Sequence, residues 1–229
     1  QFTPDPPVPF STEKTSQFYK LANEVYTAVD SNKEEKMEIA NFWDCNPYVM
    51  HQQGHLMMAT KKITPGGHWM GIVGLVTRKA GLDMVGTAEA YAMVSIGLFD
   101  GFISCWDEKF RSNVIRPETY INRFIDPDWE PTLQTPPFPE HTSGHSVISS
   151  ASCVILTKMF GDNFAFEDST EVPYNLPVRS FKSFKEAADE ASISRFYGGI
   201  HFMPAIEYGV TQGTKVGEHV LARVNTRAN

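Results

Sequence analysis

Helical periodicity runs through almost the whole chain and is interrupted where glycine and proline stand beside charged residues. Apolar residues recur at helical spacing within residues 18–29, 37–43, 49–61, 68–79, 83–109, 146–161, 183–195 and 205–224. No alternation of apolar and polar residues is long enough to predict a strand. The pattern therefore predicts an all-α helical bundle, and 229 residues with 41% hydrophobic content are enough for one domain with a single core.

Two stretches without a sustained helical pattern separate these helices. Residues 116–140 contain six prolines, so we expect a loop there with one helical turn at 118–124. We expect residues 163–180 to form a second loop. Loops of this length inside a compact domain commonly carry function.

Three short segments combine cations, a serine and histidines with glycine or proline turns. Their polar side chains are Lys109, Arg116, Ser143, His145, Arg195 and His201. Guanidinium and ammonium groups neutralise an oxyanion, and an imidazole can serve as nucleophile, metal ligand or acid/base. Together, the segments predict a pocket for a tetrahedral oxyanion.

Each of these segments lies at a helix boundary. Gly144 opens the predicted helix of residues 146–161, whose first turn offers free N–H groups to an anion. Arg195 and His201 are six residues apart and would face different sides of one continuous helix. The glycine pair between them can end that helix, so three helix boundaries can converge on one pocket.

The charge balance excludes two classes of partner. Acidic residues number 27 against 20 basic ones, the net charge is −7, and no basic run appears. We therefore expect neither a nucleic acid nor an anionic membrane surface as the main partner. The apolar stretch of residues 84–105 contains Glu89 and Asp100, so no membrane span is expected either.

Other potential metal ligands are weaker candidates. Cys45, Cys105 and Cys153 have no metal-binding spacing, and we interpret them as buried free thiols. His51 and His55 would share one face of the predicted helix 49–61, but the glutamate of the zinc-protease motif is absent, so ordinary packing is the preferred interpretation. A zinc site of His141, His145 and His201 would leave the three cations unexplained.

The order Lys-x6-Arg-Pro, Ser-Gly-His, Ser-Arg-x5-His resembles the signature of a known superfamily. That superfamily unites type 2 phosphatidic acid phosphatases, bacterial class A acid phosphatases and vanadium-dependent haloperoxidases. Trp106, three residues before the lysine, and Phe138, five before the serine, look like the halide-pocket aromatics of a bacterial vanadium-dependent iodoperoxidase. The resemblance covers residues 48–229 and implies the helical bundle of the vanadium haloperoxidase and acid phosphatase type.

The resemblance also implies a cofactor, a reaction and residue roles. The cofactor is vanadate, and the reaction is oxidation of a halide, expected to be iodide, by hydrogen peroxide to hypohalous acid. The resemblance implies that His201 is the vanadium ligand and that His145 is the acid/base. It implies hydrogen bonds to the vanadate oxygens from Lys109, Arg116, Ser143, Gly144 and Arg195. Lys109 is also implied to polarise the peroxide. Tyr48 and Asp107 join Trp106 and Phe138 as candidates for the halide pocket.

One position departs from the family pattern and leaves alternatives open. Many members carry an acidic residue four positions after the last histidine, where this chain has Ala205. Glu207 or a backbone carbonyl is then expected to orient His201. The alternative function is a soluble acid phosphatase in which His201 is the nucleophile and His145 protonates the leaving group. A helical module that binds phosphate or sulfate without turnover is a further alternative.

The start of the chain adds two expectations. It begins with Gln1 and a proline-rich segment, and haloperoxidases of the resembling type have an additional N-terminal helical half. We therefore expect residues 1–229 to be a single catalytic domain from a processed product or a fragment, with the N-terminal part of the precursor absent or present as a separate chain. Because hypohalous acid would damage a cytoplasm, we expect an exported protein.

Overall fold

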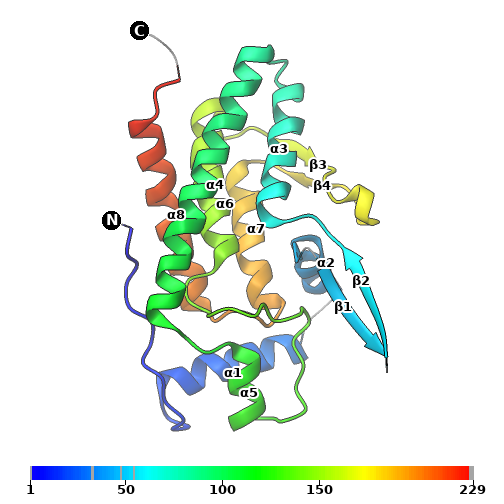
Figure 1. Ribbon diagram of the computed structural model, residues 1–229, viewed down its shortest axis with the longest axis vertical. Helices are drawn as coiled ribbons and strands as arrows, with labels where there is room; N and C mark the ends of the chain where they lie inside the picture. The colour runs from blue at the N-terminus through cyan, green and yellow to red at the C-terminus, as the bar shows by residue number, and fades with distance from the viewer. Residues whose placement is uncertain (1, 32–33, 47, 54, 227–229) are drawn as a thin grey trace.

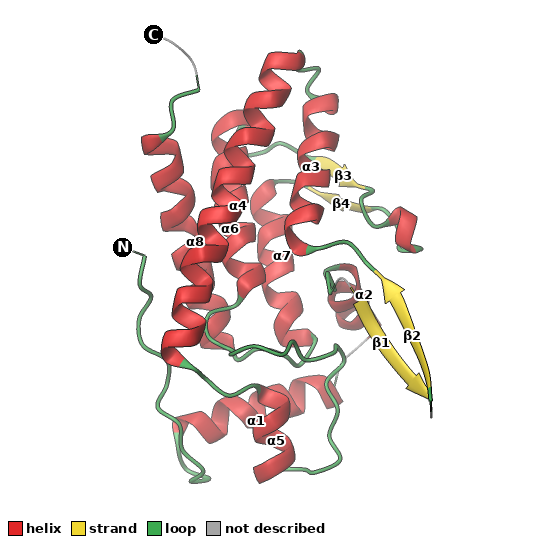
Figure 2. Cartoon of the chain, viewed as in Figure 1, coloured by secondary structure: helices red, strands yellow, loops and turns green. Residues whose placement is uncertain are grey.

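The computed structural model describes residues 2–31, 34–46, 48–53 and 55–226, with the backbone alone described over 48–53 and 56–61. Its helices are α1 (Gln17–Asp30), α2 (Glu34–Phe42), α3 (Pro65–Lys79), α4 (Met84–Ser112), α5 (Pro117–Phe124), α6 (Gly144–Phe160), α7 (Phe184–Tyr197) and α8 (Met203–Arg223). Its other elements are β1 (Tyr48–Gln53), β2 (Leu56–Lys61), β3 (Phe166–Asp168), β4 (Arg179–Phe181) and the 3₁₀ turn η1 (Val172–Tyr174). Helices dominate (Figure 2), which confirms the predicted all-α class.

The long helices form a bundle around α6. In Figure 1, α3, α4, α6, α7 and α8 run along the long axis, α1 lies across one end with α5 packed against it, and the β1–β2 hairpin projects to one side. Helix α6 packs against α4, α7 and α8. It has no Asp, Glu, Lys or Arg before Lys158, so it can be enclosed by neighbours on several sides.

Two hydrophobic clusters fix the helices relative to one another. The larger joins α3, α4, α6 and α7 through buried side chains such as Trp69, Leu98, Ile148 and Phe184. The smaller joins α1 and α5 to the segment after α7, with Phe18 against Tyr120 and Phe202 at ring distances of 5.0 and 5.3 Å. This second cluster supports the loop that leads from α5 to α6.

Glycines on α8 allow its backbone to touch α6. Gly209, Gly213 and Gly217 recur every four residues and face α6. A Cβ atom at Gly213 would lie 2.0 Å from the carbonyl oxygen of Val147. At the same interface the N–H of Ser143 donates to the carbonyl of Ala205 over 2.9 Å. The start of α6 is therefore fixed against the start of α8.

The predicted helix starts agree with the observed caps. The Asp83 side chain accepts from the N–H of Gly86 at the start of α4, and the Ser183 side chain accepts from the N–H of Glu186 at the start of α7. Gly198 follows α7, and Gly199 has a φ of 75°, which a residue with a side chain rarely adopts. The helix thus ends between Arg195 and His201, as predicted.

The predicted helix over residues 49–61 is wrong. The segment forms the antiparallel pair β1–β2, with Tyr48 opposite Lys61 and Gln53 opposite Leu56. Cross-strand pairing satisfies the backbone here, which periodicity within a single segment cannot reveal. The shared helical face predicted for His51 and His55 is lost, because His51 lies in β1 and His55 is an exposed turn residue.

The predicted loop 163–180 is only partly correct. It contains β3, which pairs with β4 so that Phe166 lies opposite Phe181. Both phenylalanines are buried in the larger hydrophobic cluster. Three-residue strands are too short to be distinguished from loop by alternation.

One described stretch, Met84–Phe124, is long and apolar enough to cross a membrane by length and composition. The mean hydropathy of its best window is 1.2, and 39% of that window is buried. A core helix meets the same criterion, and α4 contributes Met93, Val94 and Leu98 to the larger cluster. The expected absence of a membrane span stays a prediction.

We expect Gly213→Ala to lower the free energy of unfolding by roughly 3 kcal/mol, because the added Cβ meets a backbone carbonyl that cannot rotate away. Gly101→Ala on α4 is the matched control. Its Cβ would lie 3.5 Å from a Val147 methyl, an ordinary contact, so this variant should gain about 0.5–1 kcal/mol from helix propensity. Urea unfolding of both variants measures the difference, and equal effects would contradict the proposed close approach.

Candidate functional site: a buried cationic cavity

A cavity of about 190 Å³ lies where α4, α6 and the bend between α7 and α8 meet. Its lining residues are Cys45, Asn46, Pro65, Phe102, Trp106, Pro136, Phe138, Gly144, His145, Arg195, Ile200 and His201. We call it the anion cavity. It is lined by residues of two of the three segments that the sequence singled out, and Arg116 of the other segment contacts its wall at His201.

The start of α6 forms one wall of the anion cavity. The Ser143 side chain caps the helix by accepting from the N–H of Ser146 over 3.3 Å. Gly144 and His145 follow it and line the cavity. A Cβ at position 144 would lie at an ordinary contact distance of 3.5 Å from the Trp106 ring, so Gly144 lies directly beside the aromatic wall of the cavity. The positive end of the helix dipole therefore faces the cavity.

Lys109 holds the loop that precedes α6. Its ammonium donates to the carbonyls of Pro139, Glu140 and Thr142 over 2.9, 3.0 and 2.6 Å. The side chain is fully buried, and its nitrogen lies 5.3 Å from the centre of the Phe138 ring. The lysine thus shapes the loop and adds positive charge beside the cavity.

Arg116 contacts the last histidine of the motif directly. Its Nη1 lies 3.1 Å from Nε2 of His201 and also donates to the carbonyl of Ile200 over 2.8 Å. Its Nε donates to the carbonyl of Phe138 over 2.8 Å, and Nη2 is buried without a hydrogen-bond partner. The guanidinium therefore has one free donor group inside the protein.

Arg195 reaches the anion cavity from α7. It is almost completely buried, its Nε donates to Ser194 Oγ over 3.0 Å, and its Nη2 donates to the carbonyl of Trp43 over 2.8 Å. The ring of His145 hydrogen-bonds the backbone of the same Trp43. The segment after α2 therefore orients residues from two of the three motifs.

Glu140 orients His201, and the sequence interpretation missed it. Its Oε1 accepts from His201 Nδ1 over 2.8 Å and from the N–H of Phe202 over 2.9 Å. The expectation that Glu207 or a backbone carbonyl holds His201 is wrong: Glu207 is exposed, and the carbonyl of Ala205 accepts from Ser143 instead. Glu140 lies 61 residues from His201 in sequence, so no local spacing pointed to it.

The pocket has more positive than negative charge. Lys109, Arg116 and Arg195 are all buried. The acidic side chain that hydrogen-bonds His201 beside them is Glu140. Burial lowers the pKa of Lys109 to about 8 and that of Arg116 to about 10. Burial raises the pKa of Glu140 to about 7, and the charge of Arg116 opposes this rise. An anion in the cavity would relieve the repulsion among the cations.

Both cavity histidines are neutral near pH 7. Burial lowers the pKa of His145 well below the usual range, and the charge of Arg195 lowers it further. Burial lowers the pKa of His201 in the same way, and the charge of Arg116 adds to this shift. His145 Nε2 is buried without a hydrogen-bond partner. Because Glu140 receives the Nδ1–H of His201, the lone pair of this imidazole is on Nε2, where it accepts from Arg116 Nη1 over 3.1 Å.

The halide-pocket candidates divide into three groups. Trp106 and Phe138 line the cavity with ring centres 4.9 Å apart. Asp107 does not point there: its side chain is 72% exposed and lies 3.7 Å from Arg111. The Tyr48 side chain lies outside the described part of the structure.

The three-histidine zinc alternative is not supported by the geometry. Among the described residues, His141, His145 and His201 do not bring ring nitrogens within 4.8 Å of one another as a group. His141 instead packs edge-on against Tyr208, with ring centres 5.6 Å apart.

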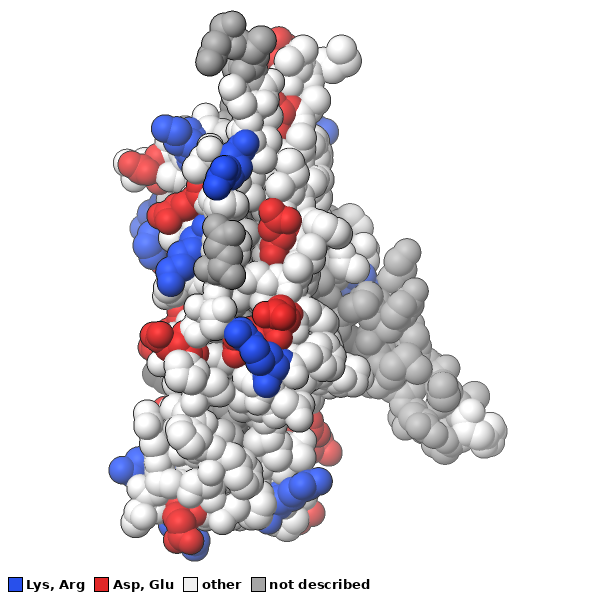
Figure 3. Space-filling view, turned by 60° about the vertical axis from the view of Figure 1, so that its left-hand side comes forward, with Lys and Arg blue, Asp and Glu red and all other residues white. Residues whose placement is uncertain are grey.

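The positive charge of the site is internal. On the face shown in Figure 3, acidic and basic side chains are interspersed, without a continuous basic area on that face. Lys109, Arg116 and Arg195, by contrast, are each 5% exposed or less. The fold and cavity thus define a helical-bundle protein with buried cations around an internal cavity.

Comparison with known proteins identifies the family. Residues 89–229 match the family model of the VCPO second helical-bundle domain, and the chain belongs to this family. The structure described as the first bacterial vanadium-dependent iodoperoxidase is 56% identical to this chain, with a TM-score of 0.91, and the match covers 98% of this chain and 54% of that one. The comparison with curated proteins gave no match.

More distant structures share the fold. Holo and apo forms of a bacterial vanadium-dependent chloroperoxidase are 15% and 16% identical, with TM-scores of 0.66 and 0.68. These matches cover 88% of this chain and 46% and 47% of the two chloroperoxidase chains. This chain therefore spans about half the length of the solved structures it matches.

We expect Glu140→Ala to lower the free energy of unfolding by about 3–5 kcal/mol, because it leaves two buried cations without their counter-charge. Glu207→Ala is the control, since that carboxylate is exposed, and it should change stability by less than about 0.5 kcal/mol. Chemical denaturation measures both values. A larger loss for the Glu207 variant would contradict the assigned role of Glu140.

The stability of the protein should fall in acid because of its buried histidines. Burial lowers the pKa of His141 to about 4, below its unfolded value, so the folded state binds fewer protons than the unfolded chain between about pH 6.5 and 4. The free energy of unfolding then decreases as the pH falls through that window, by up to about 3 kcal/mol for this group. His141→Asn should show a shallower pH slope in urea titrations; an unchanged slope would contradict the assignment.

Proposed function

We propose that this chain binds vanadate in the anion cavity and oxidises halide, with iodide as the expected substrate, using hydrogen peroxide to give hypohalous acid. The observation that carries the proposal is the set of buried groups at the cavity: Arg195 and the start of α6 line it, Arg116 contacts the oriented imidazole of His201, and the charge of Lys109 lies nearby. The 56% identity to a bacterial vanadium-dependent iodoperoxidase supports the same function.

The side chains in the cavity fit an oxyanion of this kind. Arg116 Nη2 and His145 Nε2 are buried polar atoms without hydrogen-bond partners. Buried polar groups normally have hydrogen-bond partners. These two atoms therefore indicate a ligand that accepts a hydrogen bond from Arg116 Nη2 and forms a hydrogen bond with His145 Nε2. The anion that suits this site has several oxygens and one open coordination position. The fixed donors would bind the oxygens, and the single imidazole nitrogen of His201 would take the open position.

The residues that would hold vanadate follow from this geometry. His201 Nε2 would be the protein ligand of vanadium, oriented by Glu140 through Nδ1. Arg116, Arg195 and Lys109 would neutralise the oxygens. Bound vanadate would act as a Lewis acid that activates peroxide toward the halide.

The first turn of α6 contributes both donors and an acid/base group. The Ser143 hydroxyl already accepts from Ser146, so its own proton is free to donate, and the N–H of Gly144 has no partner within the helix. His145 would transfer protons at Nε2. Negative charge in the cavity would raise its pKa from the depressed value toward neutrality, which is the range that acid/base catalysis requires.

The aromatic wall supports iodide as substrate. Trp106 and Phe138 present apolar rings on the cavity side, and the Lys109 nitrogen lies 5.8 and 5.3 Å from their ring centres. Iodide is the most weakly hydrated of the common halides, so entering an apolar wall costs it the least. The three N–H groups of Lys109 donate to loop carbonyls, so this residue contributes positive charge beside the wall.

One observation also favours the phosphatase alternative. Glu140 supplies the carboxylate that the sequence lacks at Ala205, so His201 is oriented as a nucleophilic histidine would need to be. In that reaction His145 would protonate the leaving group. The two functions therefore use the same residues and must be separated by experiment.

We expect the protein, loaded with vanadate, to oxidise iodide in the presence of peroxide and to release little phosphate from a phosphomonoester without vanadate. His201→Ala should lose vanadate retention, and His145→Ala should retain vanadate but oxidise iodide about 10²–10⁴-fold more slowly. His55→Ala, in the exposed turn between the strands, is the control and should match the wild type. Phosphate release without halide oxidation would overturn the proposal in favour of the phosphatase.

A further inference from the structure

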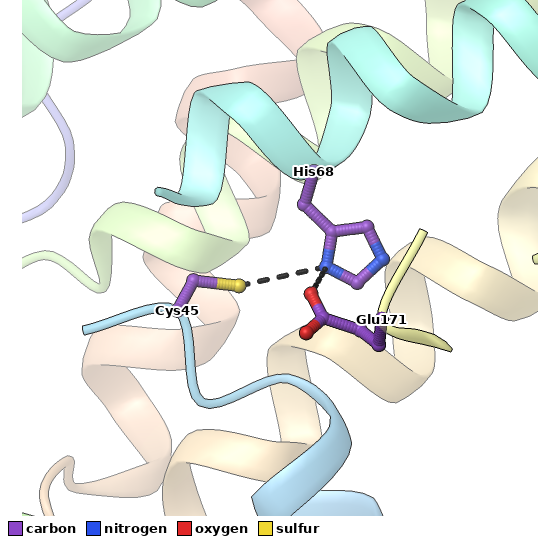
Figure 4. Close-up of side chains that lie close together, drawn as sticks. All are labelled: Cys45, His68 and Glu171. Carbon is purple, nitrogen blue, oxygen red and sulfur yellow. Dashed lines mark hydrogen bonds and ion pairs between the residues drawn. The ribbon is translucent and has the colours of Figure 1, made fainter. Parts of the chain in front are cut away.

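A second group of ligand-type side chains lies buried next to the anion cavity. Cys45 follows α2, His68 lies on α3, and Glu171 precedes η1 (Figure 4). The Cys45 sulfur and a Glu171 oxygen converge on the same ring nitrogen, His68 Nδ1, at 3.5 and 3.2 Å. All three side chains are buried, and their ligand atoms lie within 4.8 Å of one another.

Glu171 has unmet bonding capacity at this place. Its side chain is almost fully buried, and neither carboxylate oxygen has a hydrogen bond; Oε1 has only the ion-pair contact with His68 Nδ1 at 3.2 Å. A buried carboxylate normally needs hydrogen bonds or a cation to offset its desolvation. The carboxylate faces His68 and Cys45, so a ligand between the three would satisfy it.

Asp168 prepares His68 to act as a ligand through Nδ1. Its Oδ2 lies 2.7 Å from His68 Nε2, and its Oδ1 accepts from the backbone N–H and the hydroxyl of Thr170 over 2.9 and 2.6 Å. A carboxylate on one ring nitrogen holds the proton there and leaves the lone pair on the other nitrogen. The Trp43 ring, stacked 4.5 Å from the imidazole, prevents the ring from turning.

Two of the three separations between the ligand atoms match those of a tetrahedral metal site, and the third is within 4.8 Å. Zinc bonds of about 2.3 Å to sulfur and about 2.0 Å to nitrogen or oxygen place sulfur and nitrogen about 3.5 Å apart and nitrogen and oxygen about 3.3 Å apart. The observed separations are 3.5 and 3.2 Å. A thiolate, an imidazole and a carboxylate are together the donor types that zinc accepts.

We propose that Cys45, His68 and Glu171 bind a zinc ion, with Asp168 orienting His68 and a water completing the coordination. The ligands come from three separated segments, so the ion would fasten the segment after α2 to α3 and to the β3–η1 connection. Cys45 also lines the anion cavity, and the carbonyl of Trp43 orients Arg195. The ion would therefore stabilise the wall that positions one of the cavity cations.

Without a metal, the same residues would form an ion pair between a protonated His68 and the carboxylates of Asp168 and Glu171. The two states differ in metal content and in sulfur ligation. A cobalt(II) ion bound by a thiolate gives a sulfur-to-cobalt charge-transfer band and the visible bands of tetrahedral cobalt. An imidazolium ion pair gives neither.

The test measures zinc in the purified protein by elemental analysis and follows titration of the metal-free protein with cobalt(II). We expect one zinc per chain, and a charge-transfer band that zinc abolishes by displacing cobalt. Cys45→Ser should lose this band, and Asp168→Asn should bind zinc about 10–100-fold more weakly with all three ligands intact. Cys153→Ser is the matched control, because this half-buried cysteine hydrogen-bonds Thr157 elsewhere in the fold.

The outcomes separate a metal site from an ion-paired histidine. His201→Ala should retain zinc, which separates this site from the anion cavity. If Cys45→Ser does not fold, the cobalt spectrum of the wild type and its displacement by zinc decide the question. A wild-type protein that takes up neither zinc nor cobalt, or an equal loss of the band in Cys153→Ser, overturns the proposal.

Discussion

The hydrogen bond from His201 to Glu140 is the interaction on which the anion cavity depends. The carboxylate joins the loop before α6 to the bend between α7 and α8, because it accepts from both His201 and the backbone of Phe202. It also supplies negative charge beside the buried Lys109 and Arg116. Without it, three cations and a misaligned imidazole would share one buried space, which is electrostatically unfavourable.

Close packing of α6 against α8 gives this electrostatic arrangement its geometry. Gly213 allows the two backbones to touch, and the Ser143–Ala205 hydrogen bond fixes the start of α6. His145 and His201 therefore line one cavity although they belong to different helix boundaries. Because packed backbones move little, the site is largely formed before any ligand binds.

The segment after α2 connects the anion cavity to the proposed zinc site. The Trp43 carbonyl orients Arg195, its ring stacks on His68, and Cys45 faces both places. Since this segment has no regular secondary structure, side-chain contacts must hold it. A metal ion bound by Cys45 would provide a strong constraint at that point.

The sequence by itself determined the helical class, most helix boundaries and the identity of the cationic motifs, because helical spacing, caps such as Asp83 and breaks such as Gly199 are local properties. It misjudged residues 49–61, where backbone pairing across the β1–β2 hairpin outweighs local periodicity. Only the tertiary structure revealed Glu140 as the partner of His201, and brought Glu171 to His68 and Cys45. These contacts join residues far apart in the chain, so their chemistry depends on packing that no local pattern encodes.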